Sequence, residues 1–164
     1  MAAPQQQRFM RRGVSRFYFL KTIGAATGIP TRTELNGAGA TDLSPWIASI
    51  EGWASESEDI ETPDMGSSYT SKIPGPESSA DSSFTFYEDL AGDVVEQLLA
   101  KDVTGYVVIL RKGDRPASKS MDIFSVRVAS RPAEYSSGND PARFTCKFSI
   151  TAPPLLDQAV PPAT

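Results

Sequence analysis

The 164-residue sequence contains no histidine and a single cysteine, Cys146. Without histidine the chain cannot form a Ser-His-Asp or Cys-His catalytic centre, or a histidine-ligated zinc site. With one cysteine it cannot form an internal disulfide, a CxxC redox pair or a multi-thiolate metal site. Catalysis by a pair of carboxylates or by a lysine remains possible for a chain of this composition.

Long apolar runs are also missing. The longest uninterrupted run, Tyr106–Leu110, falls far short of the roughly 20 residues that a bilayer-spanning helix needs. Arginines near the N-terminus precede a short apolar run at 17–20, but Lys21 ends that run before it reaches the length of a signal-peptide core. We therefore expect no membrane segment and a chain that is cytosolic where it is synthesised.

The residues that are present favour a folded protein of one domain. Apolar residues make up 40% of the chain and aromatics 9%, which is enough to build a core at this length. The 13 prolines and 12 glycines argue against an all-helical bundle.

Charge is unevenly distributed. Residues 1–33 carry six basic side chains and no acids, residues 34–102 carry a net charge of −13, and residues 103–164 carry +3, which gives −4 in all. This segregation favours self-association, in which the basic segment of one copy meets the acidic segment of another. Solvated surface charge and a nucleic-acid-binding arm are the alternative interpretations.

Alternation of apolar and polar side chains predicts a series of β-strands. The clearest is Arg143–Thr151, where Phe144, Cys146, Phe148 and Ile150 share one face. Cys146 is accordingly expected to be a small core side chain. The other predicted strands cover residues 15–23, 46–53, 82–88, 103–111 and 121–131, and the strand at 103–111 is expected to be buried on both faces.

One helix is predicted at Asp89–Lys101, because Val94, Val95, Leu98 and Leu99 form an apolar stripe at helical spacing. Asp93 followed by Glu96 matches a capping box at its start. Residues 24–39 are predicted to be a loop with a short extended piece at 31–35. The predicted fold class is mainly β: an antiparallel β-sandwich or open barrel of about seven strands, with one flanking α-helix and extended N- and C-terminal arms.

Residues 54–81 form a long acidic excursion between two predicted strands. Two structures are possible: a linker, or an extended hairpin with arms at 58–61 and 68–73. The acids could ligate calcium, or two of them could act as the carboxylate pair of a glycoside hydrolase. They could also form a negative surface or a binding site for the basic arm, or they could be solvated surface charges without a partner. The calcium-loop motif is absent and no catalytic cleft is identifiable. The densest cluster consists of Glu56, Glu58, Asp59, Glu61 and Asp64.

Two further motifs were considered as binding sites. Gly37-Ala38-Gly39 lacks the third glycine and the following helix of a phosphate-binding loop. Several aromatic residues could form a stacking surface for sugars or bases, although aromatics at strand spacing are more often core. These residues are Trp46, Trp53, Tyr69, Phe84, Phe86 and Tyr87.

Taken together, the order of these features resembles the phage major tail tube protein family. The basic arm and the Glu34-Leu35 segment are among the features that carry the resemblance, and the similarity itself is spread from about Arg16 to Pro154. The remaining segments that carry it are Trp46–Trp53, the long polar hairpin region, Pro74–Ser79, Ser82–Asp89 leading into the helix, Val126–Pro132 and Phe144–Pro154.

The resemblance implies a structural virion protein with a two-sheet β-sandwich or open barrel and one helix, whose copies form hexameric rings that stack into a tail tube. The implied partners are further copies of the chain, a tape-measure protein, a tail terminator and baseplate or tip proteins. DNA would pass through the lumen without sequence-specific binding. The implied location is the virion tail, after assembly in the host cytoplasm. The resemblance carries over no catalytic residue, cofactor or metal site.

On this basis we expect an N-terminal arm at 1–14, a β-sandwich domain at 15–152 that includes the acidic loop or hairpin at 54–81, and a C-terminal arm at 153–164. The arms and the loop are expected to make the contacts between subunits or rings. The candidate contact residues are Arg8, Phe9, Arg11, Arg12, Glu56, Glu58, Asp59, Glu61, Asp64, Tyr69, Leu155 and Leu156.

Two other functions compete with this one. The first is a monomeric immunoglobulin-like binding module that displays Trp53 and Tyr69 to a carbohydrate or a cell-surface partner. The second is a small carboxylate hydrolase that uses the acidic cluster.

Overall fold

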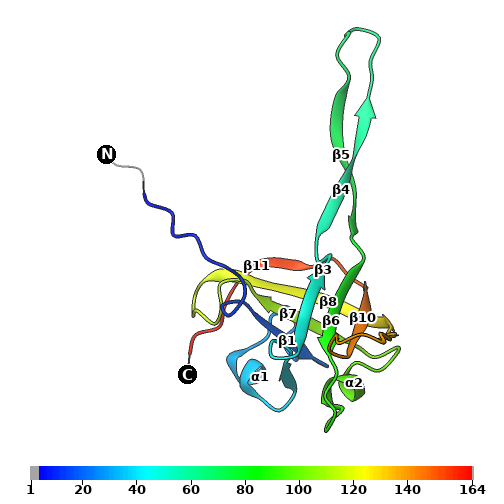
Figure 1. Ribbon diagram of the computed structural model, residues 1–164. Coiled ribbons are helices and arrows are strands. Elements are labelled where there is room, and N and C mark those ends of the chain that lie inside the picture. Colours follow the sequence, from blue (N-terminus) through cyan, green and yellow to red (C-terminus); the bar gives the residue numbers. More distant parts are fainter. Residues whose placement is uncertain (1–3, 164) are drawn as a thin grey trace. The chain divides into compact units, whose positions relative to one another are not determined.

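The structure, a computed structural model, describes residues 4–163 and is mainly β (Figure 1). Among these residues, nine strands belong to one open antiparallel sheet, while β4 and β5 pair only with each other. The predicted fold class is confirmed, with more strands than the seven expected and a second short helix. The strands are β1 (Arg16–Leu20), β2 (Ala40–Asp42), β3 (Ile47–Glu51), β4 (Ser55–Thr62), β5 (Ser71–Ser79), β6 (Ser82–Tyr87), β7 (Thr104–Leu110), β8 (Lys119–Ser130), β9 (Ala133–Glu134), β10 (Arg143–Ile150) and β11 (Leu155–Ala159); the helices are α1 (Arg32–Asn36) and α2 (Val94–Leu98).

The chain divides into two compact units. Unit 1 consists of the chain up to Trp46, Thr104–Val126, and the chain from Ala152 onward. Unit 2 consists of Ile47–Val103 and Arg127–Thr151. The long strand β8 therefore contributes its first part to unit 1 and its last part to unit 2.

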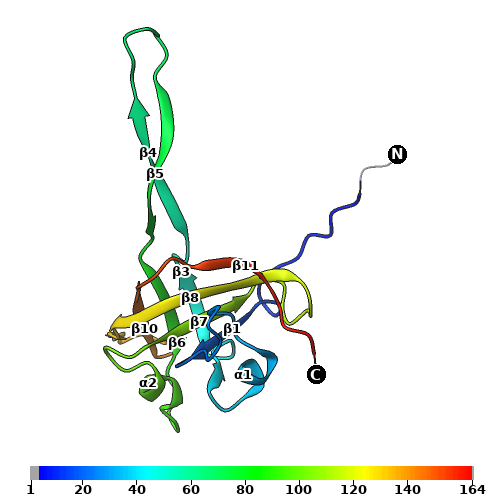
Figure 2. The same cartoon turned by 180° about the vertical axis from the view of Figure 1, so that it is seen from behind.

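Unit 1 has the strand order β2-β1-β7-β8, and β11 pairs with the first part of β8 (Figure 2). Four consecutive residues of β7, Val107 to Leu110, are buried, which confirms the prediction of a strand buried on both faces. Gly105 in the same strand lies beneath β1, where a Cβ atom would come within 2.5 Å of the Phe19 ring and 2.7 Å of the Leu20 carbonyl oxygen. Only glycine fits at this close approach.

Unit 1 contains an aliphatic core cluster. Side chains from β1, α1, β7, β8 and the chain end after β11 meet in it. Burying this much branched apolar surface is the main favourable contribution to the folding of the unit. The buried members are Leu20, Leu35, Val108, Leu110, Met121, Ile123 and Val160.

Helix α1 replaces the extended piece that was predicted at 31–35, so that prediction is wrong. Thr31 and Glu34 form a capping box: Glu34 Oε2 accepts a hydrogen bond from the Thr31 backbone N–H (2.7 Å), and Thr31 Oγ1 accepts one from the Glu34 N–H (3.3 Å). These bonds satisfy two backbone donors at the start of the helix. Leu35 then points into the unit 1 core.

Unit 2 is built around the antiparallel pair of β6 and β10, with β3 beyond β6 and β9 pairing with the start of β10. The register places Phe86 opposite Phe144, and Phe84 opposite Cys146. All four side chains are buried, as the alternation in the sequence predicts. Burial raises the pKa of the Cys146 thiol to about 12, so Cys146 is the expected core residue and stays protonated.

Helix α2 is shorter than the predicted Asp89–Lys101 helix, and its capping box does not form. Asp93 makes no side-chain cap, because its carboxylate accepts a hydrogen bond from the Gln97 side chain (2.6 Å) instead. Asp89 closes a turn by accepting from the Ala91 N–H (3.0 Å), so the chain before Asp93 is not helical. No helix in the described part of the chain has the length and apolar character to cross a membrane.

The α1 capping box generates a pH prediction. Hydrogen bonds from the backbone N–H groups of Thr31 and Gly24 lower the pKa of Glu34. The stability contributed by the Glu34 carboxylate is therefore complete above the unfolded-state pKa of about 4.5, and it is lost as the pH falls through the folded-state pKa. We expect Glu34→Gln to lower the free energy of unfolding by about 0.5–1 kcal/mol at pH 7, and by progressively less below about pH 4.5. Urea denaturation of both proteins across pH measures this; a difference that does not change with pH would contradict it.

Candidate assembly surfaces

The most exposed part of unit 2 is the β4–β5 hairpin, which projects from β3 and β6 as a two-stranded ribbon (Figure 1). Its register runs from Ser55 opposite Ser79 to Thr62 opposite Ser71, with an irregularity between Ser57 and Asp59. The segment at 54–81 is thus an extended hairpin, one of the two structures considered for it, and its arms are longer than the ones proposed at 58–61 and 68–73.

The hairpin is strongly acidic. Between Ser55 and Ser79 the sequence has six acids and one base, Lys72. Lys72 Nζ lies 3.8 Å from Glu61 Oε1, and both side chains are more than half exposed, so this ion pair contributes little stability. The acids are exposed along the ribbon: Glu56, Glu58, Asp59, Glu61, Asp64 and Glu77. A basic partner would relieve their mutual repulsion.

Within residues 4–163, no three carboxylate or thiol groups are placed so that they could share a metal ion. The acidic cluster at Glu56–Asp64 therefore has no arrangement here that matches the calcium interpretation.

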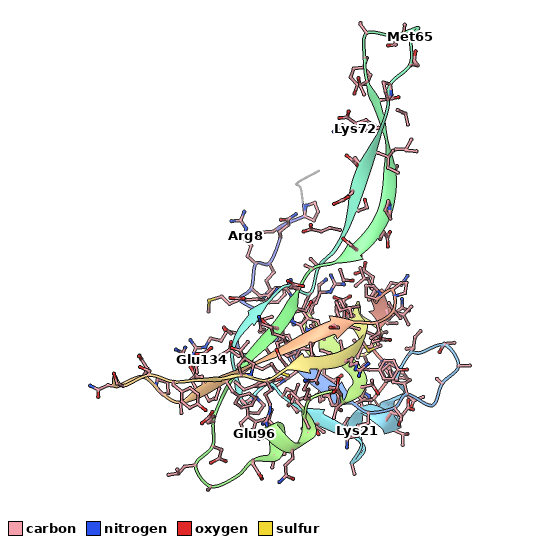
Figure 3. All side chains as sticks on the ribbon, turned by 90° about the vertical axis from the view of Figure 1, so that its right-hand side faces the viewer. Arg8, Lys21, Met65, Lys72, Glu96 and Glu134 are labelled. Carbon is pink, nitrogen blue, oxygen red and sulfur yellow. The ribbon has the colours of Figure 1, made fainter. Side chains whose placement is uncertain are left out.

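The hairpin has almost no core of its own. Its one apolar cross-strand pair, Ile60 opposite Ile73, is about half exposed. Tyr69 and Met65 are also exposed, and Figure 3 labels Met65 at the tip of the hairpin. An isolated two-stranded hairpin is marginally stable in water, so a partner that covered the ribbon would add to its stability.

The N-terminal arm is the basic counterpart. Arg8, Phe9, Arg11 and Arg12 are all exposed (Arg8 is labelled in Figure 3). From residue 4, where the described chain begins, to the turn that ends at Val14, no residue lies in a helix or a strand. The arm presents three guanidinium groups and one aromatic ring from unit 1.

The root of the arm is fixed. The backbone N–H groups of Val14 and Ser15 donate to the Arg11 carbonyl (3.0 and 2.8 Å), and Ser15 Oγ donates to the Arg111 carbonyl (2.7 Å). Gly113 lets its turn pack closely against Val14, since a Cβ atom at position 113 would lie 2.8 Å from the Val14 carbonyl oxygen.

Much of the predicted C-terminal arm is folded into unit 1. Leu155–Ala159 form β11, and the next residue, Val160, both donates to the Ser118 carbonyl and accepts from the Ala117 N–H (2.9 Å each). Leu155 packs against the unit 1 core, while Leu156 is 45% exposed. Of the two leucines, only Leu156 is presented to solvent as a large apolar group.

Two arginines that the sequence analysis did not select hold this chain end in place. Arg32 is 8% exposed and binds Asp114 with two hydrogen bonds (2.7 and 2.8 Å), while also donating to the carbonyl oxygens of Pro161 (2.5 Å) and Pro162 (3.2 Å). The hydrogen bond with Asp114 raises the pKa of Arg32 and lowers that of Asp114. These partners lie more than 80 residues from Arg32, so no local pattern reveals them.

Arg111 is the second of these arginines. It forms ion pairs with Asp122 on β8 (2.9 Å) and with Asp157 on β11. Asp122 in turn accepts a hydrogen bond from the Asp157 backbone N–H (3.0 Å). Burial raises the pKa of Asp122. The cluster fastens β11 to β8 beside a break in their register.

The aromatic residues that could form a stacking surface separate into three groups. Phe84 and Phe86 are buried. Trp46 and Trp53 are half-buried, and the Trp53 ring stacks on Phe84 with ring centroids 4.6 Å apart. Tyr69 and Tyr87 are exposed. The structure therefore does not assemble these rings into one exposed platform, and Trp53 is not displayed for a ligand as the binding-module interpretation supposes.

The sequence of residues 3–163 matches the family described as phage tail tube protein. The chain belongs to the phage tail tube protein family. Membership implies that this tail tube family protein is a structural, non-enzymatic component of a phage tail. No curated protein sequence matches the chain.

Solved structures with a similar fold also come from tail-like particles. One is a chain in the six-fold symmetrised cryo-EM structure of the anti-feeding prophage baseplate, with a TM-score of 0.59 and 12% identity over 94% of this chain and 99% of that chain. Another is a chain in the tail of an empty GTA particle with C6 symmetry, with a TM-score of 0.51 and 9% identity over 86% of this chain and 94% of that chain. At these identities the similarity is one of fold.

The buried arginine of the tail tube family protein provides a stability prediction. Arg32→Met removes the donor to one carboxylate and two carbonyls, so we expect the free energy of unfolding to fall by about 2–3 kcal/mol. Arg143→Met is the matched control, because it removes the partly exposed ion pair with Glu134 (3.5 Å) and should cost less than about 1 kcal/mol. Urea denaturation compares the two variants; equal losses would show that the Arg32 contacts do not secure the chain end.

Proposed function

We propose that this protein is a tail tube subunit whose copies form hexameric rings that stack into the conduit for phage DNA. The observation that carries the proposal is the match to the phage tail tube protein family over residues 3–163. The six-fold symmetry of the GTA tail and of the prophage baseplate, whose chains share this fold, supports the hexameric ring.

Ring closure would use the free edge of the unit 2 sheet. β3 is the last strand in the order β10-β6-β3, and its residues Ser49, Ile50 and Glu51 are exposed. A sheet edge with unpaired backbone groups tends to pair with another chain. A neighbouring subunit in the ring would satisfy this edge.

Stacking of rings would use the arm and the hairpin. The arm of one copy would lie on the hairpin of a copy in the next ring, with Arg8, Arg11 and Arg12 against the hairpin acids. Phe9 would cover part of the half-exposed Ile60 and Ile73 pair, and Tyr69 and Leu156 would add apolar area. Opposite charges would set the register of this contact, and apolar burial would add affinity.

The assembled tube would not bind DNA tightly. The net charge of −4 per subunit disfavours adhesion of a polyphosphate, so DNA would pass through the lumen without sequence-specific contacts. The further partners in this proposal are a tape-measure protein, a tail terminator and baseplate or tip proteins, with assembly in the host cytoplasm and the virion tail as the final location.

Assembly of the purified protein tests the function directly. Size-exclusion chromatography over a concentration series, followed by negative-stain microscopy, should show rings or tubes at high concentration. A chain that stays monomeric at every concentration would contradict the tube subunit and favour a monomeric binding module.

Deletion of residues 1–14 tests the role of the arm. Because the described side chains before Val14 are exposed, the truncated protein should keep its circular dichroism spectrum and unfold at nearly the same urea concentration. It should no longer form tubes under the microscope. Normal tubes from the truncated protein would rule out the arm as an inter-ring contact.

Charge exchange tests the proposed pairing of arm and hairpin. Arg8→Glu with Arg11→Glu and Arg12→Glu should block tube formation, as should Glu56→Lys with Glu58→Lys and Glu61→Lys. A protein that carries both sets should recover tubes, because the attraction is restored with its signs reversed. Glu88→Lys with Glu96→Lys, which changes acids outside the hairpin, should leave assembly unchanged. Failure of the combined variant to assemble better than either set alone would contradict the pairing.

A further inference from the structure

We propose that Gly52 and Trp53 form an elbow that fixes the direction in which the β4–β5 hairpin leaves the unit 2 sheet, and that Trp53 is a positioning residue for the contact the hairpin makes. The elbow is inferred from unit 2 alone. Only its consequence for assembly rests on the proposed function.

The backbone of the elbow is unusual. Gly52 and Trp53 both have positive φ angles, 77° and 63°. Glycine adopts this left-handed region readily, but a tryptophan does so rarely. A strained residue of this kind persists only where its surroundings hold it, and such residues cluster at sites with a functional constraint.

Gly52 lets the two chain segments at the hairpin root come into contact. A Cβ atom at this position would lie 2.1 Å from the Asp81 carbonyl oxygen and 2.8 Å from Ser82 Cα. These are backbone atoms and cannot swing aside. Next to this contact, the Ala80 N–H donates to the Ala54 carbonyl (3.0 Å), so the segments that enter and leave the hairpin are joined at its base.

Trp53 attaches the elbow to the sheet through two hydrogen bonds and through the packing of its ring. Its backbone N–H donates to Ser82 Oγ (3.0 Å), and its indole Nε1–H donates to the Ser83 carbonyl (3.3 Å). Ser82 is 2% exposed, and its hydroxyl donates a hydrogen bond to the Ala80 carbonyl oxygen (3.0 Å). The indole ring stacks on Phe84 and lies against Phe148, with ring centroids 4.6 and 5.4 Å apart.

Beyond the elbow, little else constrains the hairpin. Almost every residue of β4 and β5 is exposed, and the ribbon extends away from the other strands of unit 2 (Figures 1 and 3). Its direction is therefore set at the root. A hairpin whose direction is fixed before a partner binds loses less conformational entropy on binding. Assembly therefore begins at a lower protein concentration.

The experiment measures the direction of the hairpin in the unassembled protein. Spin labels on Lys72→Cys in the hairpin and Lys147→Cys on β10, both exposed and both in unit 2, are placed in a Cys146→Ala background. Double electron–electron resonance at a concentration below that of tube formation should give a narrow distance distribution. Trp53→Gly keeps a residue that accepts positive φ but removes the ring and its indole donor. It should broaden the distribution at least twofold and raise the concentration needed for tube formation about tenfold.

The matched control is Phe144→Leu. This change removes the ring that stacks on Phe86 (centroids 5.3 Å apart) in the same sheet, so it weakens the core without touching the elbow. It should lower the melting temperature, yet leave both the distance distribution and the assembly concentration as in the parent protein. The proposal would be overturned if Phe144→Leu and Trp53→Gly broadened the distance distribution equally. It would also be overturned if the distance distribution of Trp53→Gly were as narrow as that of the parent protein.

A milder variant covers the case in which Trp53→Gly does not fold, as judged by circular dichroism. Ser82→Ala removes the acceptor of the Trp53 N–H and should broaden the distribution in the same direction. A parent protein that never forms tubes would contradict the proposed function, whereas the distance distributions would still decide whether the elbow exists.

Discussion

The pairing of β6 with β10 is the interaction on which the rest of unit 2 depends. Its register brings Phe84, Phe86, Phe144 and Phe148 onto one face, where the rings pack edge-to-face or stacked at centroid distances of 5.3 to 5.9 Å. A shift of one residue would turn all of these side chains to the opposite face. Because Trp53 stacks on this cluster, the same register also holds the root of the hairpin.

The two units use charge in different ways. In unit 1, Arg32 is buried and Arg111 is about one-third exposed. Arg32 binds a carboxylate and two carbonyls, and Arg111 binds two carboxylates, all from distant parts of the sequence. Removing either partner would leave a polar group without a hydrogen bond, so these ion pairs fix where the chain end lies. In unit 2, the hairpin acids are exposed and have one nearby lysine. Charges of this second kind add little to folding and are available to a partner.

Membership of the phage tail tube protein family is consistent with this distribution of charge. Under the proposed function, copies of the subunit would contact each other through these surfaces. The most exposed elements in the structure, the basic arm and the acidic ribbon, have opposite charge and carry half-exposed apolar side chains. Both elements are held at their roots. The arm is held by the hydrogen bond from Ser15 to the Arg111 carbonyl and by the close approach of Gly113 to Val14, and the ribbon is held by the Gly52–Trp53 turn.

The fold class, the main strands and the core positions of β7 and β10 could be predicted from the amino-acid pattern, because alternation along a strand directly reflects which face is buried. The sequence also indicated the segregation of charge and the absence of histidine and disulfide chemistry. Helix α1 could have been predicted from the capping-box spacing of Thr31 and Glu34, but the glycines on either side of it favoured a loop. Helix α2 is short for a local reason, because Asp93 and Asp89 make side-chain hydrogen bonds of their own instead of a helix cap. The structure was needed to show that Leu155–Val160 join unit 1 and that Trp53 belongs to the root of a hairpin. Both depend on partners far away in the chain, such as Asp114 for Arg32 or Phe148 for Trp53, and local periodicity carries no information about which distant residues will meet.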